Sequence, residues 1–192
     1  MEPLRRIHVM GNSASGKSTL GARLADMLDV PFVELDALNW LPNWVGLNAT
    51  DPETFDRRLR DATAGDGWVA AGSYTTFSQR AFWDRLQVVI WLDLPRWLVL
   101  WRMFRRSWRR WRTRELLWGT NYEQFWPQFF VWRKSESLLW WIWTQHHRKR
   151  RDMLRMMADP RWRHIRFVRL TSVPETESFL ESLHAFERGL RN

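Results

Sequence analysis

The residues Gly11-Asn12-Ser13-Ala14-Ser15-Gly16-Lys17-Ser18 are the most diagnostic part of this 192-residue sequence. They fit the pattern G-x-x-x-x-G-K-[ST], in which two glycines, a lysine and a hydroxyl residue stand at fixed spacing. An apolar run at 7–10 precedes the pattern, and leucines at helical spacing follow it over 17–28. A strand, a glycine-rich turn and a helix in this order are the setting that a phosphate-binding loop (P-loop) requires.

The chemistry of phosphate binding explains these residue types. Gly11 and Gly16 allow a tight turn, so that backbone amides converge on phosphate oxygens at the start of a helix. We expect Lys17 to contact the β and γ phosphates of ATP and Ser18 to ligate Mg²⁺. The predicted nucleotide site comprises Gly11, Asn12, Ser13, Ala14, Ser15, Gly16, Lys17, Ser18 and Thr19, with ATP and Mg²⁺ as cofactors.

Strand and helix patterns alternate along the rest of the chain. Apolar runs predict strands at 7–10, 31–35, 68–71, 87–92 and 165–170. Helical patterns begin at Lys17, at Asp51-Pro52, after Pro95 and after the last strand, and another long one ends near Met157. The sequence therefore predicts an α/β fold in a single domain over 1–192, with a parallel five-stranded sheet flanked by helices.

Further landmarks resemble the adenylate-kinase-like P-loop proteins and, within them, the group described as DNA topology modulation (FlaR-like) proteins. These landmarks are Leu35-Asp36 with Trp40, the stretch 68–74, the stretch 91–95, an arginine-rich helix, and 117–121 with Glu123. The resemblance covers nearly the whole chain. It implies an adenylate-kinase-like fold with an ATP site and an Arg/Trp-rich helical lid over roughly 103–151. It also implies a small-molecule kinase, of nucleoside or nucleotide type, without identifying the phosphate acceptor.

The resemblance also assigns catalytic residues. In nucleoside monophosphate kinases, arginines on the helix after the fourth strand clamp ATP, and Arg102 and Arg106 match that pattern here. These two arginines join Lys17 as the predicted catalytic set and lie four residues apart on one helical face. A guanidinium can both position a phosphate and neutralise its charge. A second basic set, on the helix returning from the lid, falls within 148–151, where the pattern selects no single residue.

Residues that bind the acceptor are expected where the second and third strands end. Asp36 follows the second strand, at the edge where an open α/β sheet binds its ligands, or it caps a turn before Asn39. Trp40 either stacks on an acceptor ring or packs on its own domain. Gly72 and Tyr74 follow the third strand and complete the predicted acceptor site.

The sequence departs from the family pattern at the end of the third strand. Relatives often carry Asp-Gly there, with the carboxylate near Mg²⁺, whereas this chain has Ala71-Gly72. We expect that Asp36 or Asp93 compensates, or that Mg²⁺ is held weakly and phosphate transfer is slow.

The positive charge of the protein is concentrated in one segment. The net charge is +9, and residues 97–151 hold 13 Lys/Arg against 3 Asp/Glu together with most of the 16 tryptophans. This composition is typical of lid helices that pack on a core with their arginines facing phosphate or water, which is the interpretation we favour. Nucleic-acid grooves, membrane surfaces and protein partners show it too. A nucleotide-regulated nucleic-acid-binding protein is therefore the alternative function.

Composition also restricts the class of protein. The sequence contains no cysteine, which excludes disulfides, thiolate zinc sites and cysteine nucleophiles and fits a cytoplasmic protein. No apolar stretch approaches the ~20 residues that a transmembrane helix needs, and the first residues do not resemble a secretion signal.

Overall fold

Five parallel strands form the centre of the protein in this computed structural model, which describes residues 4–119, 121–122 and 138–191. Across the sheet, the order is β2 (Phe32–Glu34), β5 (Trp68–Ala71), β1 (Arg6–Gly11), β6 (Val88–Leu92) and β9 (Arg166–Leu170). All four pairings of neighbouring strands are parallel. The predicted α/β fold with a parallel five-stranded sheet is therefore confirmed.

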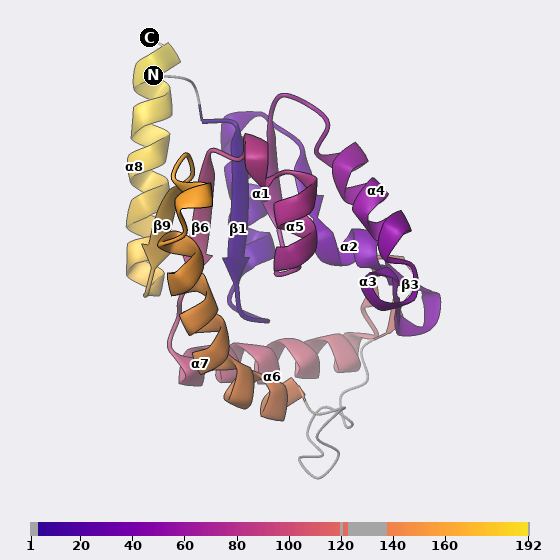
Figure 1. Cartoon of the computed structure of the whole chain (residues 1–192). Coiled ribbons are helices and arrows are strands. Elements are labelled where there is room, and N and C mark those ends of the chain that lie inside the picture. Colours follow the sequence, from indigo (N-terminus) through magenta and orange to yellow (C-terminus); the bar gives the residue numbers. More distant parts are fainter. Residues whose placement is uncertain (1–3, 120, 123–137, 192) are drawn as a thin grey trace.

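Helices cover both faces of this sheet (Figure 1). On one face lie α1 (Lys17–Leu28) and α8 (Val173–Arg191). On the other lie α4 (Pro52–Ala62), α5 (Thr75–Ala81) and α7 (Leu138–Met157). The long helix α6 (Arg96–Thr113) runs across the edge at which the strands end. Ligands of open α/β sheets bind at this edge, so α6 lies where a substrate would approach.

Alternation along the strands produces two separate apolar cores. In β1, Ile7 and Val9 point to the face of α1, where they join a cluster with Leu24. Met10 points to the opposite face and joins a cluster that includes Trp83. Because both faces are covered, β5 and β6 are buried along their whole length, as expected for strands of a parallel sheet.

Several helix and strand bounds agree with the sequence patterns. The predicted helix at 17–28 and strand at 68–71 have the same bounds in the structure. The predicted start of α4 is also correct, because Asp51 accepts a hydrogen bond from the Thr54 amide at 3.0 Å and Pro52 is the first helical residue. The predicted lid over roughly 103–151 stays a prediction, and its residues 120 and 123–137 lie outside the described residues.

The sequence patterns did not predict α5 or the shortest elements. These are α2 (Leu35–Asn39), β3 (Trp40–Leu41), η1 (Pro42–Trp44), β4 (Val45–Gly46), α3 (Leu47–Thr50), η2 (Trp83–Arg85), β7 (Leu116–Leu117), β8 (Asn121–Tyr122) and η4 (Pro160–Trp162). Within the part of the chain that the structure describes, no helix is both long and apolar enough to cross a bilayer.

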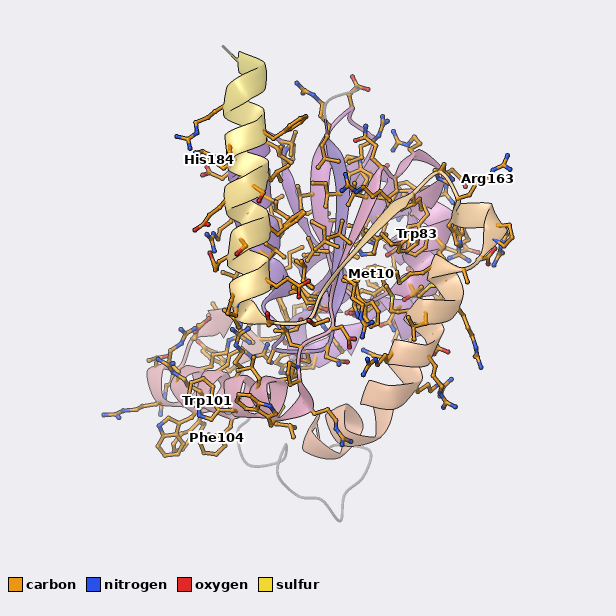
Figure 2. All side chains as sticks on the ribbon, turned by 90° about the vertical axis from the view of Figure 1, so that its left-hand side faces the viewer. Met10, Trp83, Trp101, Phe104, Arg163 and His184 are labelled. Atoms are coloured by element: carbon orange, nitrogen blue, oxygen red, sulfur yellow. The ribbon has the colours of Figure 1, made fainter. Side chains whose placement is uncertain are left out.

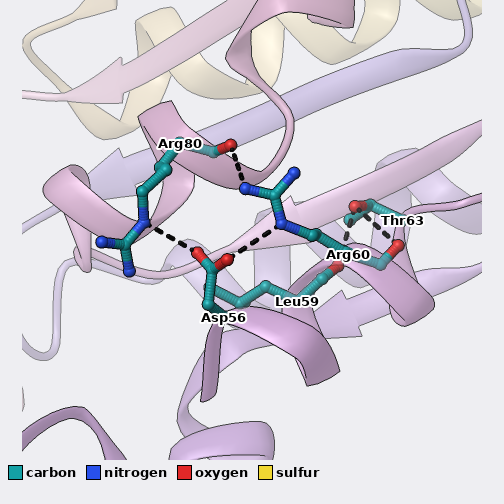
Figure 3. Close-up of polar contacts among 5 residues, drawn as sticks. All are labelled: Asp56, Leu59, Arg60, Thr63 and Arg80. Atoms are coloured by element: carbon teal, nitrogen blue, oxygen red, sulfur yellow. Dashed lines mark hydrogen bonds and ion pairs between the residues drawn. The ribbon is translucent and has the colours of Figure 1, made fainter. Parts of the chain in front are cut away.

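A cluster of charged groups fixes α4 to α5 (Figure 3). The two carboxylate oxygens of Asp56 accept hydrogen bonds from Arg60 at 2.9 Å and from Arg80 at 3.0 Å. Arg60 also donates to the backbone carbonyl of Arg80 at 2.8 Å. Both arginines are exposed, so these ion pairs add little stability and mainly orient the two helices. This orientation matters for the site because only residues 72–74 separate the end of β5 from the start of α5.

Candidate nucleotide and acceptor site

The P-loop connects β1 to α1 and needs glycine at two positions for backbone reasons. Gly11 has φ 153°, and a Cβ atom there would lie 2.9 Å from the carbonyl oxygen of Leu92 and 2.8 Å from Ser15 Oγ. Gly16 has φ 99° and immediately precedes α1. An L-residue with a side chain would be strained in either conformation. The loop can therefore take this shape only with the glycines of the motif.

Polar groups of the loop remain available for a ligand. Among the described residues, the buried atoms Asn12 Oδ1 and Ser15 Oγ have no hydrogen-bond partner. No side chain caps the start of α1, and its first turn contains no acidic residue. Uncapped amides at a helix N-terminus attract anions. The loop thus fits the phosphates of a nucleotide.

Three cationic side chains converge on the loop. Lys17 Nζ donates a hydrogen bond to the Asn12 carbonyl at 2.9 Å. From α6, Arg102 donates to the Ser15 carbonyl at 3.1 Å and Arg106 donates to Ser13 Oγ at 3.4 Å. The structure therefore brings together all three residues that the sequence predicted as catalytic. We call the P-loop with these two arginines the donor side of the site.

Burial lowers the pKa of Lys17 to about 8, and the positive charge of Arg106 contributes to this lowering. The negative charges of Asp36 and, to a smaller extent, Glu34 act in the opposite direction. Desolvation disfavours the ammonium form, and a like charge adds to this. A bound phosphate would supply negative charge that stabilises the ammonium form. The lysine is thus poised for an anionic ligand.

The carboxylate beside Ser18 comes from Glu34, a residue that the sequence analysis did not single out. Ser18 Oγ donates a hydrogen bond to Glu34 Oε1 at 2.8 Å. Glu34 ends β2 and is paired in register with Ala71, which ends β5 and is buried in the core on the α1 side. The structure thus places a carboxylate beside Ser18 that the sequence analysis did not consider, and the expectation that Asp36 or Asp93 compensates, or that Mg²⁺ is held weakly, stays a prediction.

Asp93 has a different role. Its Oδ2 atom accepts hydrogen bonds from Arg169 Nη2 at 2.5 Å and from Arg169 Nε at 2.9 Å, and lies 3.3 Å from Arg150 Nε. The carboxylate side chain is 5% exposed. Two guanidinium groups neutralise it, so Asp93 joins the end of β6 to β9 and α7.

The predicted acceptor residues Asp36 and Tyr74 meet in the structure. The Tyr74 hydroxyl donates to Asp36 Oδ1 at 2.8 Å. Burial raises the pKa of Tyr74, and the charge of Asp36 raises it further, so the phenol stays protonated and holds the carboxylate. Ser73 Oγ donates to the Gly11 carbonyl at 2.7 Å. Residues 73–74 thus connect the P-loop to Asp36.

Gly72 allows the chain after β5 to approach Leu35, the residue before Asp36. A Cβ atom on Gly72 would lie 2.6 Å from the Cβ of Leu35. The Gly72 carbonyl lies 3.2 Å from His8 Nε2, while Trp83 Nε1 donates to His8 Nδ1 at 3.2 Å. Because Nδ1 accepts, we assign the proton to Nε2, which donates to Gly72. Burial lowers the pKa of His8 to about 3, so the imidazole is neutral and anchors this backbone.

Trp40 packs within the protein, which favours the second of its two predicted roles. The ring centroids of Trp40 and Trp44 are 5.5 Å apart, and those of Trp44 and Trp118 are 5.9 Å apart. Asn121 accepts from the Trp44 amide at 2.9 Å and donates to the Leu41 carbonyl at 3.0 Å. The loop after α2 is therefore bound to the segment after α6.

A cavity of about 240 Å³ lies between α7 and the ends of β1 and β5. Its lining consists of Met10, Gly11, Ser73, Thr75, Arg148, Lys149, Asp152, Met153 and Met156. Burial lowers the pKa of Lys149 to about 8, Lys17 lowers it further and Asp36 opposes the shift. Lys149 therefore lies within electrostatic reach of both residues. We call this cavity together with Asp36 and Tyr74 the acceptor side of the site.

The four basic residues at 148–151 have different surroundings in the structure. Arg148 and Lys149 line the cavity, whereas Arg150 pairs with Asp93 and Arg151 is exposed. The sequence could not make this selection, because one residue of helical register changes which side chain faces the sheet.

Comparisons of the sequence with known proteins give a partial match to an uncharacterized protein. No family model matches the chain. Protein YqaC of Bacillus subtilis strain 168, an uncharacterized protein, is 28% identical over 122 residues, which are 62% of this chain and 66% of that protein. The chain thus spans slightly less than two thirds of this relative.

Two solved structures are similar in fold. A shikimate kinase from Acinetobacter baumannii in complex with shikimate has a TM-score of 0.53 and 21% identity, covering 98% of this chain and 95% of its own. An unliganded sugar kinase from Janibacter sp. HTCC2649 has a TM-score of 0.50 and 18% identity, and the match covers 94% of this chain and 92% of the sugar kinase. The narrower resemblance to DNA topology modulation proteins stays a prediction. The chain has the fold of the P-loop kinases that act on small molecules.

Proposed function

We propose that this protein is an ATP-dependent phosphotransferase that moves the γ-phosphate of ATP to a hydroxyl group of a small-molecule acceptor. The observation that carries this proposal is the meeting of two sets of residues at one edge of the sheet. Lys17, Arg102 and Arg106 surround the P-loop, and Asp36 and Lys149 lie beside it. A donor and an acceptor bound to these two sets would be neighbours.

The donor side suits a triphosphate with its metal. The loop amides and Lys17 bind the β and γ phosphates, while Arg102 and Arg106 neutralise charge on the transferring group. The Ser18 hydroxyl and the Glu34 carboxylate are oxygen donors of the type that Mg²⁺ prefers, so these two residues would hold the ion directly or through water. When bound, Mg²⁺ supplies additional positive charge to the phosphates.

Asp36 is the residue that we assign to the acceptor hydroxyl. In the transfer, the acceptor oxygen forms a bond to the γ-phosphorus, and the bond from that phosphorus to the bridging oxygen of ADP breaks. The hydroxyl proton passes to the Asp36 carboxylate, and ADP leaves. Tyr74 holds one oxygen of this carboxylate by its hydrogen bond and so fixes the direction of the other.

Two cations in the cavity favour an acceptor that carries an anionic group. Arg148 and Lys149 line the cavity with one carboxylate, Asp152, which lies 3.9 Å from Arg148. A carboxylate or phosphate of the acceptor would be attracted by the positive charge of Arg148 and Lys149. The names of the two solved relatives, a shikimate kinase and a sugar kinase, support a small hydroxylated acceptor.

A screen of candidate acceptors for ADP release in the presence of ATP and Mg²⁺ tests this proposal. The panel contains hydroxy acids, sugar acids, sugar phosphates, neutral sugars, nucleosides and nucleotides. We expect stimulation by a hydroxylated anion, and its loss in Lys17→Ala. If no acceptor raises ADP release above the rate without acceptor, or if Lys17→Ala retains the stimulated rate, the proposal is wrong.

The alternative function, nucleotide-regulated binding of nucleic acid, has no separate observation in its favour. The two arginines that the resemblance singled out on α6, Arg102 and Arg106, contact the P-loop rather than an outer surface. A cytoplasmic location remains part of the proposal and rests on the lack of cysteine in the sequence.

A further inference from the structure

The outer face of α6 carries five large aromatic side chains in one line, which we call the aromatic stripe. They are Trp97, Trp101, Phe104, Trp108 and Trp111, with exposed fractions of 71%, 54%, 49%, 42% and 41%. The spacing of alternately four and three residues places them on a single helical face. Figure 2 shows Trp101 and Phe104 pointing away from the sheet.

The opposite face of α6 carries its buried residues. Val99, Met103 and Ser107 are buried there, and Arg102 and Arg106 reach the P-loop from the same side. The expectation that the tryptophans of this segment pack against the core is therefore wrong for α6. An exposed apolar surface of this extent on a protein marks an interaction site.

Positive charge accompanies the stripe. The 18 residues of α6 include seven arginines and no acidic residue. Arg105, Arg109 and Arg112 are exposed and lie along one flank of the stripe, where Arg109 pairs with the Glu115 carboxylate at 3.3 Å. The Arg105 guanidinium is 5.4 Å from the ring centroid of Trp101. The surface thus combines exposed indole rings with guanidinium groups that lie beside them.

This combination selects one class of partner. A second copy of the chain would bring arginines against arginines, which opposes pairing through this face. Single-stranded nucleic acids bind in grooves that track the backbone, whereas the stripe is an outward helix face. A helix with tryptophans on one face and arginines beside them is typical of helices that lie in the headgroup region of an anionic bilayer.

We propose that the aromatic stripe docks α6 on a membrane surface that contains anionic phospholipids. The indole rings enter the headgroup region, and Arg105 and Arg112 contact lipid phosphates. Since Arg102 and Arg106 leave the same helix in the opposite direction, docking places the nucleotide site about one helix diameter, ~10 Å, from the bilayer. This inference is independent of the proposed kinase activity.

Flotation of the full chain with lipid vesicles tests the inference. We expect binding to phosphatidylcholine vesicles that contain roughly one third phosphatidylserine, little binding to pure phosphatidylcholine, and weakening by salt. The variant Trp97→Ser/Trp101→Ser should bind at least about tenfold more weakly, because two indoles no longer enter the interface. Arg105→Gln should bind about fivefold more weakly, the expected contribution of one basic residue near such a surface.

Matched variants elsewhere on the surface serve as controls. Phe186→Ser removes a ring of similar exposure, 44%, from α8, and Arg163→Gln removes an exposed arginine far from the stripe (Figure 2). Both should bind vesicles as the wild type does. Circular dichroism and thermal melting establish that each variant is folded.

Three outcomes would overturn the inference. The first is equal binding of Trp97→Ser/Trp101→Ser and wild type to the anionic vesicles, or no binding by either. The second is binding of a single-stranded oligonucleotide through Trp97 and Trp101 without binding of vesicles, which would assign the stripe to nucleic acid. The third is dimerisation, without lipid, that the same substitutions abolish.

Discussion

The donor side and the acceptor side share one edge of the sheet but are built in different ways. The donor side comes from eight consecutive residues, Gly11 to Ser18, and one helix that crosses them. The acceptor side is assembled from residues far apart in sequence, namely Asp36, Tyr74 and Lys149. The comparison teaches that a backbone requirement is visible in a local motif, whereas a site built by tertiary packing is not.

The strongest test of the donor side removes its lysine. Lys17→Ala should weaken binding of Mg-ATP by about 100-fold or more, because several charge-assisted hydrogen bonds to phosphate are lost together. Isothermal titration calorimetry measures this directly. Lys149→Ala is the matched control on the acceptor side, and it should change ATP affinity little. Equal affinities in wild type and Lys17→Ala would remove the basis for a donor side.

The second test concerns the carboxylate that approaches Ser18. Glu34→Gln keeps the size of the side chain but removes its charge, so the Mg²⁺ requirement for ATP turnover should rise by roughly 10-fold or more. Asp36→Asn, two residues away, should lower turnover without changing the Mg²⁺ requirement.

The same titration examines position 71. Ala71 is buried in the apolar core and paired in register with Glu34, so Ala71→Asp would bury a second carboxylate beside the first. We therefore expect Ala71→Asp to destabilise the protein rather than to improve Mg²⁺ binding. A lower Mg²⁺ requirement in Ala71→Asp, or an unchanged one in Glu34→Gln, would contradict this assignment.

The third test uses the pH dependence of ATP binding. Lys17 has a pKa of about 8 in the free protein, and phosphate favours its charged form. Below pH 8 the lysine is already protonated, so its contribution is constant. Above pH 8 binding must take up one proton, and the affinity should fall by up to about tenfold per pH unit. Lys149→Met should retain this dependence, and loss of the dependence in that variant would assign it to the acceptor side.

Much of the fold could be predicted because its determinants are local. The helix at 17–28 and the strand at 68–71 have clear apolar patterns and the same bounds in the structure. Elements such as α2 and β3 are too short to show any period, and α5 is only seven residues long. Their positions follow from packing around β5 and α4 rather than from their own sequences.

The residues that were missed depend on tertiary contacts. Glu34 approaches Ser18 because β2 and α1 pack side by side, which no spacing between positions 18 and 34 reveals. Lys149 is selected from four consecutive basic residues only by the register of α7. The Asp93 carboxylate, which the sequence analysis offered as one of two residues that compensate for the missing acid at position 71, is paired with two arginines that come from β9 and α7.

The helix α6 shows how a periodicity argument can fail. Its aromatic residues at 97, 101, 104, 108 and 111 have the spacing of a core-facing helix, yet they are exposed. The inward face contains Val99 and Met103, which are buried in the core, together with Arg102 and Arg106, because this helix crosses the phosphate site as well as the core. The hydrophobic pattern identified the correct helix but the wrong face.

The division between the two sides is tested most directly by calorimetric titration of Mg-ATP into wild type and two double variants. On the donor side, Arg102→Ala/Arg106→Ala removes two positive charges from the P-loop. On the acceptor side, Asp36→Asn/Lys149→Met removes one charge of each sign, so the net charge near the loop is unchanged. We predict a loss of about 10- to 100-fold in ATP affinity for the first variant and a change within about threefold for the second. Equal affinity of the donor-side variant and wild type, or an equal loss in both variants, would contradict the account.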